Sequence, residues 1–367
     1  MSEFKLLHVE NDRTTDQHVY VQTGDGAFRY EVFLDYAKGL PEDLFMMPVN
    51  GNVGGGFCDK DDNLYLVFRG GGVGMTPGAP PSYIKLDPDG NYLGRLCEGK
   101  LGGMPHFGQM TPEGTILMAF IGRQQVVEMD LQGNELMTIG ELGRPNGNKP
   151  FNPDLDPHYV RIHYGLFATE PIHYGGHGVY DQMMDFENTE FIPKPFCNPN
   201  AVAQDSKGNL WVTDGYGNFG LYKFDRKGNL LDVYGGKGVW DYKTDTPGKF
   251  LVAHSVDVDA NDHVWVCDRE KDAIHVFDTE GNVVFYASHN LGQPSGVGSD
   301  GKYVYVVGRG GYITIFDLEF NLVGKLGFFN GNLRAHDIAV DSKGNLYLFP
   351  THANEEHQVI ALKRIYE

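Results

Sequence analysis

The feature that most constrains the fold is a unit of roughly 40 residues, the size range of propeller repeats, that recurs along the chain. Its clearest copy, Asp205 to Gly235, reads "DSKGNLWVTDGYGNFGLYKFDRKGNLLDVYG". Apolar and polar residues alternate with period two, and Gly, Asn and Asp mark the turns between the apolar runs. Five further copies begin at "DKDDNLYL", "TPEGTILM", "DANDHVWV", "SDGKYVYV" and "DSKGNLYL". Each copy therefore predicts four short antiparallel strands.

Six such units predict an all-β fold, a six-bladed β-propeller that occupies residues 1–367 as one domain. A blade buries its faces only against neighbouring blades, so the repeats must close into a ring. The apolar segment 28–36, "FRYEVFLDY", is expected to add a closing strand to the last blade and to cover its open edge.

The spacing is broken once, between the second and third units, by residues 146–196. This segment is too long for a loop between blades and too aromatic for a disordered linker. We expect an ordered excursion over one face, such as a lid. Its four histidines lack a simple metal-ligand spacing, and we interpret them as surface or packing residues.

Composition narrows the choice of partners. The formal charge is −19, and the chain has no basic stripe, which disfavours nucleic acid and anionic membranes as partners. No segment approaches the roughly 18 apolar residues of a membrane helix, and the N-terminus lacks the features of a signal peptide. Four cysteines without a CxxC pair fit reduced thiols. We expect a cytoplasmic protein that binds a small molecule or another protein.

Histidines recur at one position of the innermost strands. When the first strands of the six units are aligned, the second position holds Gly55, His106, Asn200, His254, Ser295 and His336. Histidine thus occurs in blades two, four and six, which are related by threefold rotation about the channel. Three converging imidazoles with an open position are the ligand set of a catalytic zinc ion, although iron, cobalt, nickel or copper also fit this ligand type. Asp337 could orient His336 or bind a hard cation.

The ends of the second strands return to the same face and carry further polar residues. Arg69, Arg269 and Arg309 share one register there, which suits a carboxylate or another oxyanion. Ion pairs between blades are the alternative, with Glu270 and Asp268 as available partners. Tyr216 could act as a general base if a metal ion and nearby guanidinium groups stabilise its phenolate.

These motifs together resemble a known family. The units are similar to NHL repeats, and the set "MPH", "VAHS…CDRE", "AHDI", "TDGYGN" and "VFRG" resembles the peptidyl-α-hydroxyglycine α-amidating lyases. The resemblance covers about Asn50 to the C-terminus, without the excursion. It implies a zinc ion on the three histidines and a structural calcium ion held partly by Asp337. It also implies catalytic roles for Tyr216, Arg69 and Arg269 in cleaving the C–N bond of an α-hydroxyglycine.

Three departures from the family pattern concern the substrate. Gly217 replaces a cysteine, so the family's local disulfide to the counterpart of Cys197 cannot form. Arg334 replaces a methionine and adds a cation near the pocket, and the excursion is not part of the family core. We assign Arg334, Arg309 and Asn200 to binding of a small, carboxylate-bearing substrate.

Three functional hypotheses follow. The first is a metal-dependent lyase that cleaves a C–N bond of a carbinolamide or acts on another hydroxylated carboxylate. The second keeps the metal but uses hydrolysis or hydration, as in lactonase-like propellers. The third is a non-catalytic NHL propeller that binds a protein.

Overall fold

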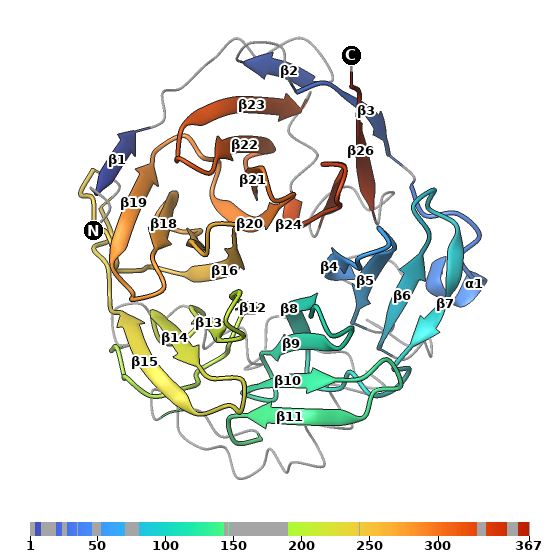
Figure 1. The fold of residues 1–367 in the computed structure, drawn as a ribbon, viewed down its shortest axis with the longest axis horizontal. Coiled ribbons are helices and arrows are strands. Elements are labelled where there is room, and N and C mark those ends of the chain that lie inside the picture. Colours follow the sequence, from blue (N-terminus) through green and yellow to red (C-terminus); the bar gives the residue numbers. More distant parts are fainter. Residues whose placement is uncertain are drawn as a thin grey trace.

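The computed structural model confirms the predicted six-bladed β-propeller (Figure 1). It describes residues 4–8, 20–23, 28–34, 36–45, 53–69, 81–142, 146, 190–241, 243–328, 335–350 and 359–366. Six sheets surround a central axis, each with four antiparallel strands, and the first strand of each unit lies innermost. The one helix among these residues is the single turn α1 (Glu42–Phe45), so no described helix is long enough to cross a membrane.

The first three blades are each built from four consecutive strands. Blade one contains β4 (Val53–Cys58), β5 (Leu64–Phe68), β6 (Ser82–Leu86) and β7 (Tyr92–Leu96). Blade two contains β8 (Pro105–Met110), β9 (Ile116–Phe120), β10 (Gln125–Met129) and β11 (Glu135–Ile139). Blade three contains β12 (Ala201–Gln204), β13 (Leu210–Asp214), β14 (Gly220–Phe224) and β15 (Leu230–Gly235).

The other three blades include strands from the N-terminal segment. Blade four contains β16 (Ala253–Val258), β17 (Val264–Asp268), β18 (Ala273–Phe277) and β19 (Val283–Ser288), with β1 (Lys5–His8) parallel to β19. Blade five contains β20 (Pro294–Ser299), β21 (Tyr303–Gly308), β22 (Tyr312–Asp317) and β23 (Leu322–Phe328), with β2 (Tyr20–Thr23) antiparallel to β23. Blade six contains β24 (Ala335–Val340), β25 (Leu346–Pro350), β26 (Ile360–Arg364) and β3 (Tyr30–Phe33).

Blade six is therefore assembled from two distant parts of the chain. β3, which lies inside the segment 28–36, pairs with β26 from Arg364↔Tyr30 to Ala361↔Phe33. Strands β1 and β2 were not predicted from the sequence; they extend blades four and five to five strands. The strands β1, β2 and β3 thus form the outer edges of three successive blades (Figure 1).

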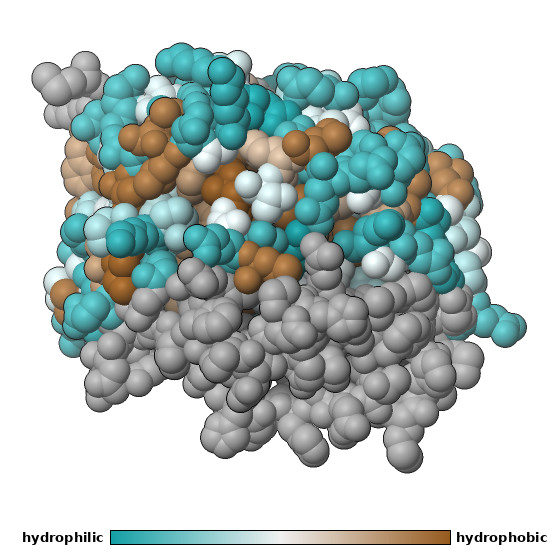
Figure 2. Space-filling view, turned by 90° about the horizontal axis from the view of Figure 1, so that it is seen from below, coloured by the Kyte–Doolittle hydropathy of each residue, from teal (hydrophilic) through white to brown (hydrophobic). Residues whose placement is uncertain are grey.

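The hydrophobic core lies between the blades. Each interface has its own buried cluster that combines residues of two neighbouring blades, such as Trp265 of blade four with Val306 and Phe316 of blade five. Large rings are fully buried in these interfaces, including Trp211 and Trp265. On the side seen in Figure 2, the described part of the surface carries many hydrophilic residues with hydrophobic ones between them. Burial between blades is what holds the ring together and leaves a channel on its axis.

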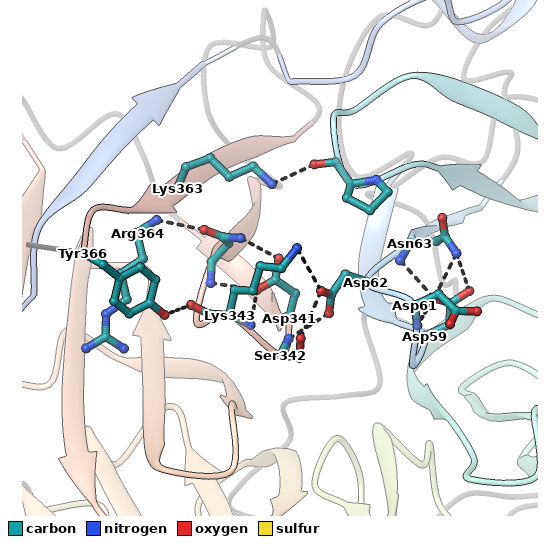
Figure 3. A network of polar contacts seen from close by, with 12 residues as sticks. Asp59, Asp61, Asp62, Asn63, Asp341, Ser342, Lys343, Lys363, Arg364 and Tyr366 are labelled. Carbon is teal, nitrogen blue, oxygen red and sulfur yellow. Dashed lines mark hydrogen bonds and ion pairs between the residues drawn. The ribbon is translucent and has the colours of Figure 1, made fainter.

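One face of the ring, here called the turn face, carries the turns between the first and second strands of the blades. On this face, polar contacts join blade six to blade one (Figure 3). The Ser342 backbone N–H and hydroxyl both donate to the Asp62 carboxylate, at 2.9 and 3.0 Å. The same arrangement joins blades three and four, where Ser206 donates twice to Asp262. Both aspartates have positive φ, 62° in each case, and both serines begin a "SKGN" turn. The contact between the last and first blades, where the ring closes, is therefore the same as the contact between two consecutive blades.

The two ends of the excursion after blade two lie next to each other. The Asn146 backbone N–H donates to the Phe196 carbonyl at 2.8 Å, and its side-chain amide donates to the Lys194 carbonyl at 2.8 Å. Residues 147–189 lie outside the described residues, so the expectation of a lid remains a prediction.

Candidate metal centre

Three histidines from alternate blades meet on the channel axis. His106 in β8, His254 in β16 and His336 in β24 are buried, and their ring centroids are 4.9 to 5.2 Å apart. One ligand nitrogen from each ring lies within 4.8 Å of the others. Each histidine sits where the pairing with the second strand shifts by one residue, at the start of the innermost strand. This irregularity turns the imidazoles toward the axis.

Backbone carbonyls of the intervening blades fix the orientation of each imidazole. The Nδ1 atoms of His106, His254 and His336 contact the carbonyl oxygens of Asn200, Ser295 and Gly54 at 2.8, 2.7 and 2.9 Å. A carbonyl can only accept, so each Nδ1 carries the proton and each Nε2 keeps its lone pair. Second-shell contacts of this kind set the tautomer of metal-binding histidines.

The strand pairing corrects one position of the sequence alignment. Val53 pairs with Phe68 and Gly56 with Leu66, as Pro105 pairs with Phe120 and Gly108 with Met118. Gly54, and not Gly55, is therefore equivalent to the histidines. The sequence comparison missed this because the extra residue of the register shift falls within a run of three glycines.

Burial keeps the three imidazoles neutral. It lowers the pKa of each histidine well below its usual value, and the charges of nearby arginines lower it further. Neutral imidazoles whose Nε2 lone pairs meet in one place, with room for a further ligand, are what a catalytic zinc ion requires. The three histidines therefore fit a zinc ion.

Tyr216 lies beside the nitrogens that would hold the metal. Its hydroxyl is 2.7 Å from Nε2 of His254 and 3.3 Å from Nε2 of His106. Arg269 Nη1 donates to the same oxygen at 3.2 Å. The phenol oxygen thus contacts a guanidinium on one side and two imidazole nitrogens on the other. An oxygen in this position can exchange a proton with a ligand bound at the histidines.

A carboxylate that was proposed only as an ion-pair partner holds Arg269 in place. Glu270 accepts from Arg269 Nε at 2.6 Å and from Nη2 at 2.8 Å, which leaves Nη1 for Tyr216. Its carboxylate is also 3.8 Å from Arg309 Nη1. The ion pair between blades that was the alternative is thus seen for Arg309, whereas Arg269 pairs with its sequence neighbour in the same blade.

Arg69 approaches the centre from blade one. Its Nε donates to the Pro105 carbonyl at 3.0 Å, and its buried Nη2 has no hydrogen-bond partner among the described residues. Its positive charge contributes to the lowered pKa of both His106 and His336, which places it near both rings. A buried guanidinium nitrogen with unused donors is suited to an anionic ligand.

Two further residues were assigned to substrate binding. The Asn200 side-chain oxygen accepts from the backbone N–H groups of Gly215 and Tyr216, at 2.7 and 3.2 Å, and its buried side-chain nitrogen has no hydrogen-bond partner among the described residues. Asn200 also orients His106 through its carbonyl, and its binding of substrate stays a prediction. Arg334 lies outside the described residues.

A cavity lies further along the channel from the three histidines. It has a volume of about 430 Å³, and Gln109, Ser255, Asp257, Ser299 and Asp337 contribute polar groups to its lining. Burial raises the pKa of Asp257 to about 7 and that of Asp337 to about 8. The Phe107 ring lines this cavity and contacts the rings of His254 and His336, with centroids 5.2 and 4.9 Å apart. Phe107 therefore separates the cavity from the histidines.

The four cysteines lie among the described residues and form no disulfide, in line with the expectation for Cys197. Cys197 is buried, and a side chain at Gly217 would point at its sulfur. The structure thus keeps the neighbouring positions of the family's disulfide but has only one of the two thiols.

No family model matches the chain. It is 32% identical over 127 residues to NHL repeat-containing protein 3 of Homo sapiens, which covers 33% of this chain and 35% of that protein. It is 35% identical over 83 residues to a probable peptidyl-alpha-hydroxyglycine alpha-amidating lyase of Caenorhabditis elegans, which covers 22% of this chain and 23% of that protein. The matched part is thus about a third or less of these relatives.

Among solved structures, virginiamycin B lyase from Staphylococcus aureus superposes with a TM-score of 0.54 at 11% identity, over 92% of this chain and all of that one. At this identity the likeness concerns the fold alone. The structure and the structural match define the chain as a six-bladed β-propeller. Parts of its sequence are similar to an NHL repeat-containing protein and to a probable peptidyl-alpha-hydroxyglycine alpha-amidating lyase.

Proposed function

We propose that the protein is a metal-dependent lyase that cleaves the C–N bond of a small, carboxylate-bearing carbinolamide. The observation that carries this proposal is the convergence of three Nε2 lone pairs beside the Tyr216 hydroxyl. A zinc ion held by His106, His254 and His336 would act as a Lewis acid and make the substrate hydroxyl more acidic. The similarity to a probable amidating lyase supports this reaction class.

The residues of the chain account for the other parts of the reaction. Arg69 Nη2 would bind the α-carboxylate and fix the carbinol carbon. The Tyr216 phenolate would accept the hydroxyl proton, and Arg269 would stabilise that phenolate through the existing hydrogen bond. As the O–H bond breaks, a C=O bond forms and the C–N bond breaks. The amide nitrogen takes up a proton, which gives an amide and glyoxylate.

The test compares two histidines. His254→Ala removes a candidate ligand, whereas His263→Ala removes a histidine that pairs with Asp259 on the turn face. We expect the first variant to lose zinc and glyoxylate release from N-benzoyl-α-hydroxyglycine, and the second to keep both. Full metal content and full turnover in His254→Ala would refute the proposal. Lactone hydrolysis without glyoxylate release would favour a hydrolase, and a wild-type protein without metal would favour a binding propeller.

We further propose that Asp337 holds a hard cation such as Ca²⁺ in the cavity beyond Phe107. Asp337 is buried, and one of its oxygens accepts from the Gly56 N–H at 3.2 Å. Carboxylate oxygens are the ligands that Ca²⁺ prefers, and a buried carboxylate needs a counter-charge or a proton. Asp257 lines the same cavity and supplies a second carboxylate.

A further inference from the structure

We infer that Gly54 is a positioning residue for Arg69: the absence of a side chain at this position reserves the space in which the Arg69 guanidinium lies. Gly54, Asn200 and Ser295 occupy equivalent positions in blades one, three and five, and the carbonyl of each orients one histidine. This inference rests on the proposed function only for what Arg69 is positioned to bind.

The three equivalent positions differ in what fills the adjoining space. In blade three the side chain of Asn200 itself does so and accepts from two backbone N–H groups. In blade five the Ser295 hydroxyl donates to the Ala335 carbonyl at 2.8 Å. In blade one the guanidinium takes that place, because a Cβ on Gly54 would lie closer than 3.0 Å to Arg69 Nε, Cζ and Nη2. Any side chain at position 54 must therefore displace the guanidinium.

Displacement would change the donors that Arg69 presents. Arg69 reaches across to blade two, where its Nε donates to the Pro105 carbonyl, the residue before His106. Its Nη2 is the nitrogen left for an anion. Gly54 meanwhile orients His336 through its carbonyl at 2.9 Å. One residue thus fixes both a candidate metal ligand and a candidate carboxylate-binding group relative to each other.

The change Gly54→Ala should move Arg69 without unfolding the protein. The atoms that a new Cβ would meet belong to the far end of a flexible side chain. Two residues later, a Cβ on Gly56 would instead meet the Tyr65 carbonyl and the Phe349 ring, which cannot move freely. An alanine at position 56 is therefore expected to disturb the packing of the fold, whereas an alanine at position 54 is expected to move only Arg69. Position 54 is thus the one that tests the inference.

The first measurement follows the Arg69 Nε–H group by NMR, with its cross-peak assigned by its loss in Arg69→Ala. We expect the cross-peak to be present in the wild type and in Ser295→Ala, the matched change in blade five, and to be lost or strongly shifted in Gly54→Ala. The thermal midpoint of Gly54→Ala should stay near that of the wild type. Retention of the cross-peak in Gly54→Ala, its absence from the wild type, or a large fall in thermal midpoint would overturn the inference.

The second measurement is a double-mutant cycle with N-benzoyl-α-hydroxyglycine. A reacting group misplaced by 1 Å can cost about 100-fold, so we expect a decrease of that order in kcat/KM for Gly54→Ala. Because the effect acts through Arg69, Gly54→Ala should add no further loss in the Arg69→Ala background. Additive losses would overturn the inference. If the NMR result holds but the wild type releases no glyoxylate, the proposed function fails and the positioning of Arg69 stands.

Discussion

The two levels of the channel are lined by the same six strands but have opposite chemistry. At the histidine level, neutral imidazoles are surrounded by the positive charges of Arg69, Arg269 and Arg309. The cavity beyond Phe107 is instead lined by carboxyls, those of Asp257, Asp259 and Asp337, and by the Cys58 thiol. His336 and Asp337 are neighbours in β24, yet one belongs to each level. A shift of one residue along a strand therefore separates the site proposed for a borderline metal from the site proposed for a hard cation.

The difference teaches how a propeller can keep two sites apart on one axis. Burial has opposite effects on the two kinds of side chain: it lowers the pKa of the histidines and raises that of the aspartates. Without metal, the histidines are therefore neutral at any pH above their lowered pKa, and the aspartates are neutral at any pH below their raised pKa. The following changes test whether the separation depends on Phe107 and on the sign of these shifts.

The largest effect is expected from removal of the ring that divides the channel. Phe107 is buried, and a buried Phe→Ala change typically costs about 3–5 kcal/mol of unfolding free energy. Phe107→Ala should also join the cavity to the histidine level and weaken zinc binding. Phe57→Ala, which removes a buried ring from the wall of the same cavity, should cost similar stability and retain zinc. Urea unfolding and metal analysis of both variants check this, and equal zinc loss in both would contradict a dividing role.

The next effect concerns the pH dependence of the carboxylate level. The folded pKa of Asp337, about 8, lies above its unfolded value, so its contribution to stability is complete below about pH 4 and is lost as pH rises through 8. Asp337→Asn cannot ionise. In the presence of a chelator, its stability relative to the wild type should rise between pH 4 and 8 by more than about 1.4 kcal/mol, the equivalent of one pKa unit.

Calcium should reverse that comparison. If Asp337 binds the ion, added Ca²⁺ stabilises the ionised wild type at pH 8 and leaves Asp337→Asn unchanged, because ligand binding to the folded state raises its stability. Thermal unfolding with and without Ca²⁺ measures both effects. Equal stabilisation of the two proteins by Ca²⁺ would place the ion elsewhere.

The smallest effect is the opposite pH response of the histidine level. The folded pKa values lie below the unfolded value of about 6.5, so this contribution is complete above that pH and is lost as pH falls. Each histidine adds up to one proton, or about 1.4 kcal/mol per pH unit, to the slope of stability against pH. In metal-free protein below pH 6.5, His254→Ala should show a slope smaller by about that amount, and an unchanged slope would contradict it.

Most of the fold could be predicted because each blade repeats the same local signals. Alternation of apolar residues, with turns marked by Gly, Asn or Asp, is visible in every unit, and six units predict a closed ring. Strands β1 and β2 could not be predicted in this way, because each has four residues and no repeat to align with. Their structure depends on outer strands that are distant in the sequence, Val283–Ser288 and Leu322–Phe328.

The candidate site was predictable where residue type and register agreed. His106, His254 and His336 recur at one point of the repeat, and the structure brings them together. The sequence alignment placed Gly55 at the histidine position where the structure has Gly54, because a run of glycines gives no register signal. Asp257 was missed because "HSVDVD" shows only a strand with alternating polar residues. The role of Phe107 depends on the distance between rings of different blades, which sequence spacing does not contain.

The assembly of blade six has a consequence for the order of events during synthesis. Strand β24, which carries His336, is translated after the strands of the first five blades, and β3 must wait unpaired for β26. The carbonyl that orients His336 belongs to Gly54 at the other end of the ring. Metal loading is therefore expected to follow translation of the last blade, so the centre would exist only in chains whose ring has closed.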